Sequence, residues 1–383
     1  MDFKMTEEQE LLLESLKELV EREWNEEAYN DCYYRDHTYP LDFISKLSEA
    51  GFTMLGVPEE YGGTPVDYLT LVMFAKELAR LTGASLPTSS NAISIDDILS
   101  FGNEEQKKFI LEYVTEHGTS PFALGFSEPQ AGSDSSAITT TATRKDGKVY
   151  INGHKTMVSD ADTSPYLLTI TRDLEAEKPM KAMSMWLVPM DAPGVKLEPL
   201  HKIGLKTSGF HEIYLENVEI EESALIGIEG EGFMQLMKNF EIERLMLVAI
   251  GVGMAEAAFE EVARYANFRE QFGKPIGQFQ IIQEKITDMA IKIANMKSHI
   301  FECAWKKDND ISIMVESALA KRYCSQASFE VLDEAMQILG GIGYTEESRI
   351  SRMWVDVRHL RIAGGTDEIM VHIAGRQLLK QYR

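Results

Sequence analysis

The chain has few cysteines and no long apolar run. Its three cysteines, Cys32, Cys303 and Cys324, show no CxxC spacing and cannot all pair, which is typical of a protein from a reducing cytosol. The longest apolar run, residues 245–255, is too short to span a bilayer. The first residues lack the basic and apolar segments of a signal peptide. These absences predict a cytoplasmic protein without membrane contact.

Basic residues are also scarce. The 38 Lys and Arg against 61 Asp and Glu give a formal net charge of −23, which argues against nucleic acid and anionic membranes as partners. An anionic ligand would therefore need local basic groups. The eight histidines are scattered, with no pair at the spacing of metal ligands. No Gly-x-Ser-x-Gly elbow or Walker loop is present, so we expect no metal, serine-hydrolase or P-loop chemistry.

The two ends of the chain have helical periodicity. Leucines and Val20 recur at helical spacing between residues 11 and 20, and Thr6 followed by Gln9 resembles a capping box. After residue 227 the helical pattern returns in four long segments joined by short loops, which predicts a four-helix bundle. The expected helices cover 231–267, 277–306, 311–340 and 365–381.

The middle of the chain consists of short runs rich in β-forming residues. Residues 149–151, 167–170 and 183–188 are such runs, separated by turn signals such as Asp146-Gly147. The pattern predicts a small antiparallel β-barrel or sandwich. The expected fold class is therefore α+β with several domains: an N-terminal helical domain (1–119), the middle β domain (120–226) and the C-terminal four-helix bundle (227–383).

Two middle segments carry the small and hydroxylic residues that suit a flat ligand. Gly125–Asp134 is Gly-Phe-Ser-Glu-Pro-Gln-Ala-Gly-Ser-Asp, a loop whose backbone can lie against a ring system. Lys155–Asp160 follows some twenty residues later and keeps a hydroxyl at Ser159. Taken alone, the first segment is also compatible with an ordinary surface turn, and the second with a strand whose methionine fills a core.

Two later segments complete the pattern. Glu241-Ile-Glu-Arg244 lies early in a long helix, and Arg361-Ile-Ala-Gly-Gly-Thr-Asp-Glu-Ile369 opens the last one. In this order the motifs resemble those of the acyl-CoA dehydrogenase family from end to end. The resemblance implies FAD as cofactor, an acyl-CoA thioester as substrate, an electron-transferring flavoprotein as redox partner and, most often, a homotetramer. The implied reaction interconverts a short-chain acyl-CoA and its 2,3-enoyl-CoA.

The resemblance also implies flavin-binding roles. Phe126 and Ser127 would offer backbone groups to the flavin, Met157 and Ser159 would lie beside its N5 atom, and Ser133 would help to hold CoA. Most relatives have an aromatic residue and a threonine where this chain has Met157 and Ser159, and methionine shields a ring less rigidly. The dinucleotide side, which a neighbouring subunit usually contributes, is implied for Arg269, Gln271, Phe272, Gln280, Gln337, Gly340, Gly341, Thr366 and Glu368.

The catalytic base is expected at an unusual place for the family. Many members have a glutamate just before the final Gly-Thr pair, where this chain has Gly364. Some branches instead keep their base where this chain has Glu243, so the resemblance implies a relocated base with a raised pKa. A solvated helix residue is the alternative for Glu243. The Gly364 N–H would donate to the thioester carbonyl, and the substrate side would include Glu241, Arg244, Ala363, Gly364 and Gly365.

Within the family, the likeness is greatest to the crotonobetainyl-CoA reductase branch. It is carried by Met1–Phe3, Asp31–Asp36, Ala304–Asn309 and Leu379–Arg383. This likeness predicts crotonobetainyl-CoA and γ-butyrobetainyl-CoA as the substrate pair. A trimethylammonium group needs aromatic faces and carboxylates, for which Asp96 and Asp97 are candidates, although such a pair more often marks a helix start.

Other functions stay open. The chain could oxidise a different short or branched acyl-CoA, or could be a non-redox acyl-CoA lyase such as a desulfinase, although such a lyase would not need Glu243. An oxygen-using oxidase is a further alternative, although we do not expect here the extra C-terminal domain that is common in acyl-CoA oxidases. A helical adaptor would bind no flavin, and the retention of all the flavin segments argues against it.

Overall fold

The computed structural model describes residues 4–86 and 88–382, with residues 88–94 described by their backbone alone. The chain divides into two compact units. The first, here called the helical unit, comprises Met1–Glu26, Val66–Leu86 and Glu241–Arg383. The second, the mixed unit, comprises Glu27–Pro65 and Pro87–Phe240.

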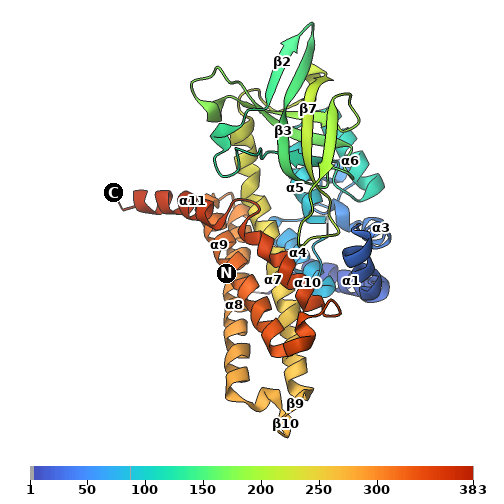
Figure 1. Cartoon of the computed structure of the whole chain (residues 1–383), viewed down its shortest axis with the longest axis vertical. Helices are drawn as coiled ribbons and strands as arrows, with labels where there is room; N and C mark the ends of the chain where they lie inside the picture. Colours follow the sequence, from blue (N-terminus) through green and yellow to red (C-terminus); the bar gives the residue numbers. More distant parts are fainter. Residues whose placement is uncertain (1–3, 87, 383) are drawn as a thin grey trace. The chain divides into compact units, whose positions relative to one another are not determined.

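The helical unit is built almost entirely from long helices (Figure 1). A short hairpin of β9 (Glu270–Gln271) and β10 (Lys274–Pro275) connects α7 to α8. Single 3₁₀ turns lie at η7 (Ile276–Gln278), η8 (Gly340–Tyr344) and η9 (His359–Arg361). The helices are α1 (Glu7–Glu23), α4 (Tyr68–Thr82), α7 (Gly232–Phe268) from Glu241 onward, α8 (Gln280–Asp308), α9 (Met314–Leu339), α10 (Arg349–Arg358) and α11 (Asp367–Lys380).

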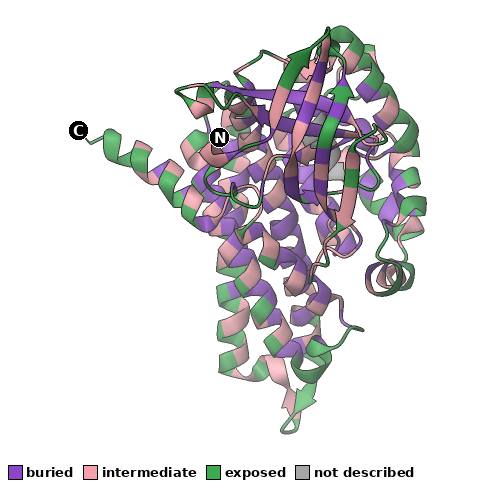
Figure 2. Ribbon diagram, turned by 45° about the horizontal axis from the view of Figure 1, so that its top comes forward, coloured by how far each residue is buried: buried purple, intermediate pink, exposed green. Residues whose placement is uncertain are grey.

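Helix α9 is the central helix of this unit. It contacts α8, α10 and α11, and Figure 2 shows buried residues along these helices. Its buried face consists mostly of small residues such as Ser317, Ala318 and Ala320, which let neighbouring helices approach closely. An ion pair of 2.7 Å between Lys292 and Glu330 joins the outer surfaces of α8 and α9.

The N-terminal helix α1 begins as the sequence predicts. Thr6 Oγ1 accepts the Gln9 N–H at 3.2 Å, and Gln9 Oε1 accepts the Thr6 N–H at 3.1 Å. The predicted capping box is thus confirmed. Leu16 and Leu19 are buried, and the Gln9 amide donates to Thr70 Oγ1 on α4 at 3.0 Å. A polar contact and an apolar face therefore fix α1 on α4.

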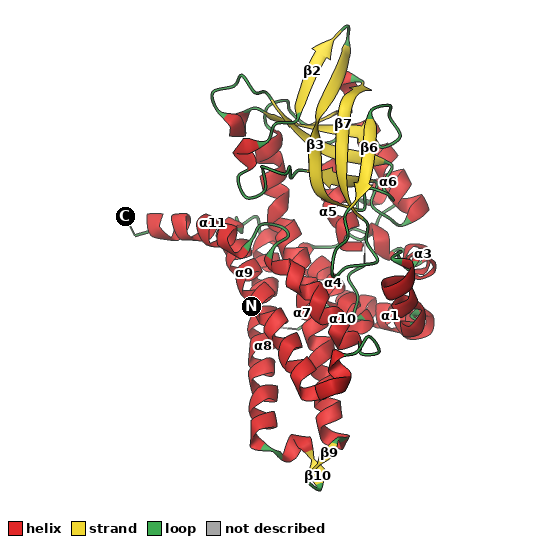
Figure 3. Ribbon diagram, viewed as in Figure 1, coloured by secondary structure: helices red, strands yellow, loops and turns green. Residues whose placement is uncertain are grey.

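The mixed unit contains two four-stranded sheets, ordered β1-β4-β5-β8 and β2-β3-β7-β6 (Figure 3). The strands are β1 (Phe122–Gly125), β2 (Thr141–Lys145), β3 (Lys148–Ser159), β4 (Tyr166–Arg172), β5 (Met183–Pro189), β6 (Val195–Pro199), β7 (Phe210–Ile220) and β8 (Leu225–Ile226). The accompanying helices are α2 (Glu26–Asp31), the π-helix η1 (Cys32–Asp36), α3 (Leu41–Glu49), α5 (Thr88–Phe101) and α6 (Glu104–His117), with 3₁₀ turns η2 (Phe52–Met54), η3 (Glu59–Tyr61), η4 (Ser135–Ala137), η5 (Pro179–Lys181) and η6 (Glu222–Ala224).

The first sheet is buried on both faces. Leu167 and Val188 share one core cluster with Ile213 of the second sheet, whereas Leu168 packs in another cluster with Ile110 of α6. Strands β4 and β5 are accordingly buried along nearly their whole length, while burial alternates along much of β3 and β7. This pattern is typical of a sheet covered by helices on one side and by a second sheet on the other.

Four details differ from the sequence-based expectation. The sheets do not close into a barrel, and one pair of strands, β1 and β4, is parallel, with Phe122 opposite Tyr166. The C-terminal region also contains α10, which the expected set of four helices omits. The second long helix begins at Gln280 rather than 277, because the β10 hairpin strand and a 3₁₀ turn occupy the preceding residues.

A buried ion pair supports the loop after β1. Lys155 Nζ lies 2.8 Å from Glu128 Oε1, and both side chains are almost fully inaccessible. Glu128 also accepts the backbone N–H groups of Thr139 and Thr140 at 2.7 and 3.0 Å. Burial alone would raise the pKa of Glu128, but Lys155 and these donors lower it to about 2. The Lys155 ammonium further donates to the Phe126 carbonyl at 3.3 Å, so the pair holds the loop against β3.

Replacing this lysine is expected to destabilise the fold strongly. Lys155→Met leaves the Glu128 carboxylate buried without its cation, so the free energy of unfolding should fall by about 3–5 kcal/mol. Urea unfolding followed by tryptophan fluorescence measures the change. Lys148→Met, which removes a cation from an exposed pair with Glu221, is the control and should shift the midpoint little. Equal midpoints for the two variants would contradict the role of the buried pair.

Candidate active site

A bulge in β3 turns Met157 outward. The register of β3 against β7 shifts between Lys155 and Val158, and Met157 has a φ of 59°, in the left-handed region that non-glycine residues rarely adopt. Its side chain is 58% exposed, whereas Thr156 and Val158 on either side are buried. Backbone strain of this kind is concentrated at functional sites.

The loop after β1 lies directly beside this bulge. The Thr156 N–H donates to the Ser127 carbonyl at 3.0 Å, and Phe126 precedes Ser127 on the same loop. Ser159 is exposed two residues after Met157. The mixed unit therefore brings all four residues predicted for the flavin ring into one neighbourhood. An exposed thioether and hydroxyl beside open loop backbone fit the face and polar edge of a flat heterocycle.

The predicted base is partly shielded from solvent. Glu243 lies on α7, and its Oε2 atom is inaccessible and has no hydrogen-bond partner among the described residues. Burial raises the pKa of Glu243 to about 7, and the cations Arg244 and Lys321 limit the rise. A solvated helix glutamate would have neither the shielded oxygen nor the raised pKa. The environment suits a group that accepts and returns a proton near neutral pH.

Gly364 and Gly365 form a turn whose carbonyls are held and whose N–H groups are free. The Gly364 carbonyl accepts from Arg244 Nε at 3.4 Å, and the Gly365 carbonyl accepts from Lys321 Nζ at 2.6 Å. Within the described part of the chain, neither glycine N–H donates a hydrogen bond. Both residues have positive φ, 63° and 95°, which suits glycine. The turn can thus present N–H donors to an oxygen of a ligand.

Position 364 and Glu243 point to the same stretch of α7. A Cβ added to Gly364 would lie 2.9 Å from Leu247 Cδ1 and 4.0 Å from Arg244 Cγ. Leu247 follows Glu243 by four residues, so both side chains lie on one face of the helix. A carboxylate at position 364 would therefore extend along the face that already carries Glu243. This geometry is compatible with the expected relocation of the base from position 364 to Glu243.

Lys321 belongs to this site but escaped the sequence-based prediction. It is fully buried on α9, beside the turn that follows η9, and burial lowers its pKa to about 8, against the opposing effect of Asp367. The usable signal was its position in the helix, because Lys321 falls on the stripe that includes Ser317, Cys324 and Ser328, all buried. A lysine inside such an apolar stripe calls for a partner or a function.

Two of the three segments expected on the dinucleotide side meet at one end of the helical unit. The ion pair between Lys285 and Glu334 joins the start of α8 to the end of α9, next to the β9–β10 hairpin. At Gly340 φ is 65°, and nothing lies within 4 Å of a Cβ added to Gly340 or Gly341, so backbone there is open to close approach. The predicted residues at this end are all exposed: Arg269, Gln271, Phe272, Gln280, Gln337, Gly340 and Gly341.

The third segment lies at the other end of α9. Thr366 caps α11 by accepting the Ile369 N–H at 3.3 Å, and Glu368 is exposed one residue into that helix. The Lys321 contact to Gly365 places this segment beside the first half of α9. Residue 337 is about 24 Å further along α9 at 1.5 Å per residue. One copy of the chain therefore does not bring all the predicted dinucleotide residues together.

Other predicted substrate residues have different settings. Asp97 is buried, and its carboxylate accepts a hydrogen bond from the Asn239 amide of α7, within the mixed unit. Asp96 is partly exposed. Ser133 is exposed on the loop after β1, next to Gly132, where a Cβ would meet nothing within 4 Å. Glu241 and Ala363 are both partly buried. Glu241 precedes Arg244 on α7, and Ala363 precedes Gly364, the residue that Arg244 contacts.

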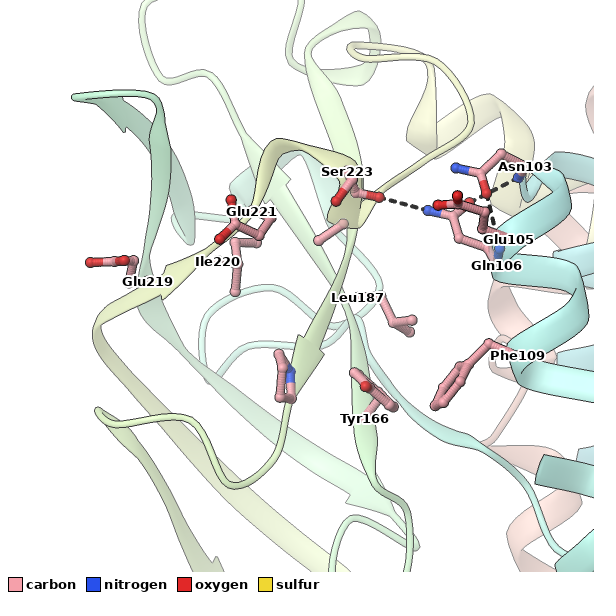
Figure 4. Close-up of a pocket in the computed structure, with 12 residues that line it drawn as sticks. Asn103, Glu105, Gln106, Phe109, Tyr166, Leu187, Glu219, Ile220, Glu221 and Ser223 are labelled. Carbon is pink, nitrogen blue, oxygen red and sulfur yellow. Dashed lines mark hydrogen bonds between the residues drawn. The ribbon is translucent and has the colours of Figure 1, made fainter. Parts of the chain in front are cut away.

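The mixed unit also has a surface cleft of about 400 Å³ between α6 and the strands of the first sheet (Figure 4). Gln106 crosses it and donates to the Ser223 carbonyl at 2.9 Å. Glu105, Glu219 and Glu221 line the cleft, and it contains none of the predicted site residues. An acidic lining disfavours the phosphates of a CoA thioester, so the cleft is not a candidate for that ligand.

Part of the likeness to the crotonobetainyl-CoA reductase branch lies outside the described residues, namely Met1–Phe3 and Arg383. Among the residues that are described, no helix combines the length and the apolar composition required to cross a membrane.

Comparison with known proteins gives consistent matches along the chain. Sequence models for the acyl-CoA dehydrogenase N-terminal, middle and C-terminal domains match residues 6–117, 123–218 and 230–379. "Probable acyl-CoA dehydrogenase YdiO" of Escherichia coli K12 is 49% identical over 383 residues, all of both chains. Butyryl-CoA dehydrogenase from Megasphaera elsdenii is 28% identical with a TM-score of 0.91, over 99% of this chain and 100% of that one. One chain in the structure titled for the electron transferring flavoprotein of Acidaminococcus fermentans is 30% identical, with a TM-score of 0.91. The match covers 99% of this chain and 100% of that one.

The conformation of the glycine turn can be tested by stability. Gly364→Ala introduces a Cβ at positive φ and close to Leu247, so the free energy of unfolding should fall by about 1–2 kcal/mol. Gly375→Ala on α11 is the matched control, because its Cβ would meet nothing within 4 Å, and it should gain up to about 1 kcal/mol. Chemical denaturation at neutral pH measures both changes. A Gly364→Ala variant as stable as the parent would rule out the described turn.

Proposed function

Because this chain belongs to the acyl-CoA dehydrogenase family and is an FAD-dependent enzyme that acts on acyl-CoA, we propose that it interconverts a short-chain acyl-CoA and its 2,3-enoyl-CoA with Glu243 as the catalytic base. The observation that carries this proposal is the shielded Glu243 carboxylate beside a glycine turn with free N–H groups. Together they supply a proton acceptor and a carbonyl-binding donor.

Glu243 exchanges the proton at Cα of the thioester. In the oxidative direction the ionised carboxylate takes the α-proton, and in the reductive direction the protonated acid returns it. A pKa near 7 makes both forms available at neutral pH. Bound FAD supplies the two-electron chemistry by accepting or returning a hydride at the substrate's Cβ.

The Gly364 N–H stabilises the negative charge that develops on the thioester oxygen. A backbone donor fixed before the reaction needs no reorganisation as the charge forms, which is the basis of oxyanion-type stabilisation. Removal of the α-proton places charge on that oxygen. The held carbonyls of Gly364 and Gly365 keep the turn in place, and Ala363, a small residue, leaves room for the acyl group.

The flavin is proposed to bind where open backbone and exposed polar groups coincide. Phe126 and Ser127 would hold the polar edge of the ring, with Met157 and Ser159 near its reactive face. The exposed residues at the hairpin end of α9, Arg269 among them, would hold the dinucleotide of a flavin bound to a second copy, because they lie far from Gly364 along α9. This separation supports a homo-oligomer, and we propose a cytoplasmic homotetramer. Ser133 would contact the CoA portion.

For the acyl group, we propose the pair crotonobetainyl-CoA and γ-butyrobetainyl-CoA. Support comes from the sequence likeness of Asp31–Asp36 and Ala304–Asn309 to that branch. Asp96 and Asp97 are the carboxylates proposed for a trimethylammonium group, and Asp97 is also hydrogen-bonded to Asn239. Electrons are proposed to pass to or from an electron-transferring flavoprotein. Similarity to a chain from the Acidaminococcus fermentans structure is consistent with that partner.

An anaerobic titration of the holoenzyme tests the function. γ-Butyrobetainyl-CoA, butyryl-CoA and isovaleryl-CoA are added separately while the flavin absorbance is recorded. Bleaching by the betaine thioester alone is the expected result. Bleaching only by the simple thioesters would keep the reaction but replace the substrate. No bleaching by any of them would overturn the redox function and favour a lyase on the same fold.

The base assignment predicts the behaviour of Glu243→Gln. The variant should retain flavin and thioester binding, but the rate of flavin reduction should fall by about 10²–10⁴, the usual contribution of a general base. Stopped-flow absorbance measures this rate. Glu260→Gln, a partly exposed carboxylate on the same helix, is the control and should reduce normally. Substantial reduction by Glu243→Gln would move the base elsewhere.

The raised pKa predicts opposite pH dependences for the two directions. Oxidation needs ionised Glu243, so kcat/KM for an acyl-CoA should rise as the pH increases through about 7. Reduction of an enoyl-CoA needs the protonated acid, and its kcat/KM should decline through the same range. Steady-state assays with an artificial electron carrier compare the two directions. They cover a range of about pH 5.5 to 8.5, which brackets a pKa of about 7. Parallel profiles would contradict a single acid–base group.

A further inference from the structure

Lys321 is the only fully buried lysine that contacts the glycine turn among the described residues. Its Nζ atom donates to the Gly365 carbonyl at 2.6 Å. Among the described residues, this ammonium makes no other hydrogen bond or ion pair. Lysine is almost never fully buried unless it is paired. This buried cation donates its one strong hydrogen bond to a backbone carbonyl and not to a carboxylate. The contact indicates that Lys321 helps to hold the turn in place.

The charges around Lys321 come from each element packed near it. On α7 these are Glu243 and Arg244, with Glu241 acting in turn on Arg244. On α9 the neighbouring Arg322 donates to the Asp367 carbonyl at 3.1 Å. Asp367 and Glu368 of α11 also act on Lys321. Arg361 of η9 and Gln326 of α9 both bind Asp367 Oδ2, at 2.8 and 3.0 Å. Asp367 is the strongest of the charges acting on Lys321, but its Oδ2 atom already pairs with Arg361, while its Oδ1 atom has no hydrogen-bond partner among the described residues. Glu243, in contrast, has no hydrogen-bonded cation among the described residues.

We propose that Lys321 is a positioning residue, which fixes the Gly364–Gly365 turn through the Gly365 carbonyl and keeps Glu243 ionised when the enzyme oxidises its substrate. This inference rests on the proposed role of Glu243. Lys321 does not touch the reacting atoms in this scheme. It acts through the turn that offers the Gly364 N–H and through its positive charge near the carboxylate.

A cation is needed for both tasks. An uncharged donor could bind the Gly365 carbonyl but could not favour the charged form of a shielded carboxylate. Arg244 contributes charge as well, but its hydrogen bond to Gly364 is long at 3.4 Å, so the turn depends mainly on Lys321. Because an opposite charge nearby lowers the pKa of a carboxyl group, loss of Lys321 should raise the pKa of Glu243 and suppress oxidation at neutral pH.

The test compares Lys321→Met, Lys321→Arg and the parent holoenzyme in two measurements. The first is an infrared titration of the carboxyl C=O band that disappears in Glu243→Gln, recorded without substrate. In Lys321→Met its midpoint should move up by about one pH unit or more, and Lys321→Arg should restore it. The second is the pH profile of flavin reduction, whose acidic limb should move in the same direction.

Lys76→Met is the matched control, because Lys76 is also buried in the helical unit but pairs with Glu77 and Glu256. It should leave the Glu243 midpoint unchanged, even if it lowers stability. An unchanged midpoint in Lys321→Met, or an equal shift in Lys76→Met, would overturn the inference. If Lys321→Met does not fold, Lys321→Gln takes its place, with the same expected shift.

The two measurements also separate this inference from the proposed function. If no thioester reduces the flavin of the parent enzyme, the proposed function fails, but the infrared titration still reports whether Lys321 controls the ionisation of Glu243. If the parent enzyme is reduced normally and the midpoint does not depend on Lys321, only the positioning role fails.

Discussion

The chemistry proposed for this chain depends on one carboxylate, Glu243, which has an oxygen shielded from water and no salt bridge that neutralises it. A carboxylate in water is too weak a base, and a carboxylate locked to a cation is weaker still. Burial raises the pKa of Glu243 to about 7, and Arg244 and Lys321 keep the ionised form accessible. The rest of the helical unit can be understood as the framework that holds these three groups, with α7 carrying two of them and α9 the third.

The Gly364–Gly365 turn is the second part of the proposed active site. Where many family members place a glutamate, this chain has Gly364, and its positive φ of 63° suits that residue. Glycine at this position keeps the backbone N–H and lets Leu247 Cδ1 lie where a Cβ would crowd it, 2.9 Å away. The function of the lost side chain and the function of the retained backbone are thus separable. In the proposed mechanism, the base therefore lies on α7 while the carbonyl-binding donor lies on the turn before α11.

Much of this arrangement could be predicted from the sequence. The capping box at Thr6 and the long C-terminal helices follow from local patterns, and both are confirmed. The resemblance to the family implies that Ser127 and Met157 lie near each other, and the hydrogen bond from the Thr156 N–H to the Ser127 carbonyl places their segments side by side. Sequence patterns did not predict α10, because its short amphipathic stretch is flanked by turns. They also predicted a possible barrel, because alternation within strands does not reveal whether the outermost strands of two sheets meet.

Two features of the site depend on tertiary structure. The outward position of Met157 results from a register shift between β3 and β7, which neither strand encodes alone. The role of Lys321 depends on its contact with Gly365, 44 residues further along the chain. Its burial could have been suspected from the helical stripe that it shares with Ser317 and Cys324, but its partner could not.

The most direct test of Glu243 as the base is exchange of the substrate's α-proton with solvent. The holoenzyme is incubated in D₂O with a thioester that it binds, and loss of the α-proton signal is followed by NMR, which detects proton removal even without net turnover. We expect the parent enzyme to catalyse exchange and Glu243→Gln to lose at least about a hundredfold in rate. Exchange at the parent rate in Glu243→Gln would show that another group removes the proton.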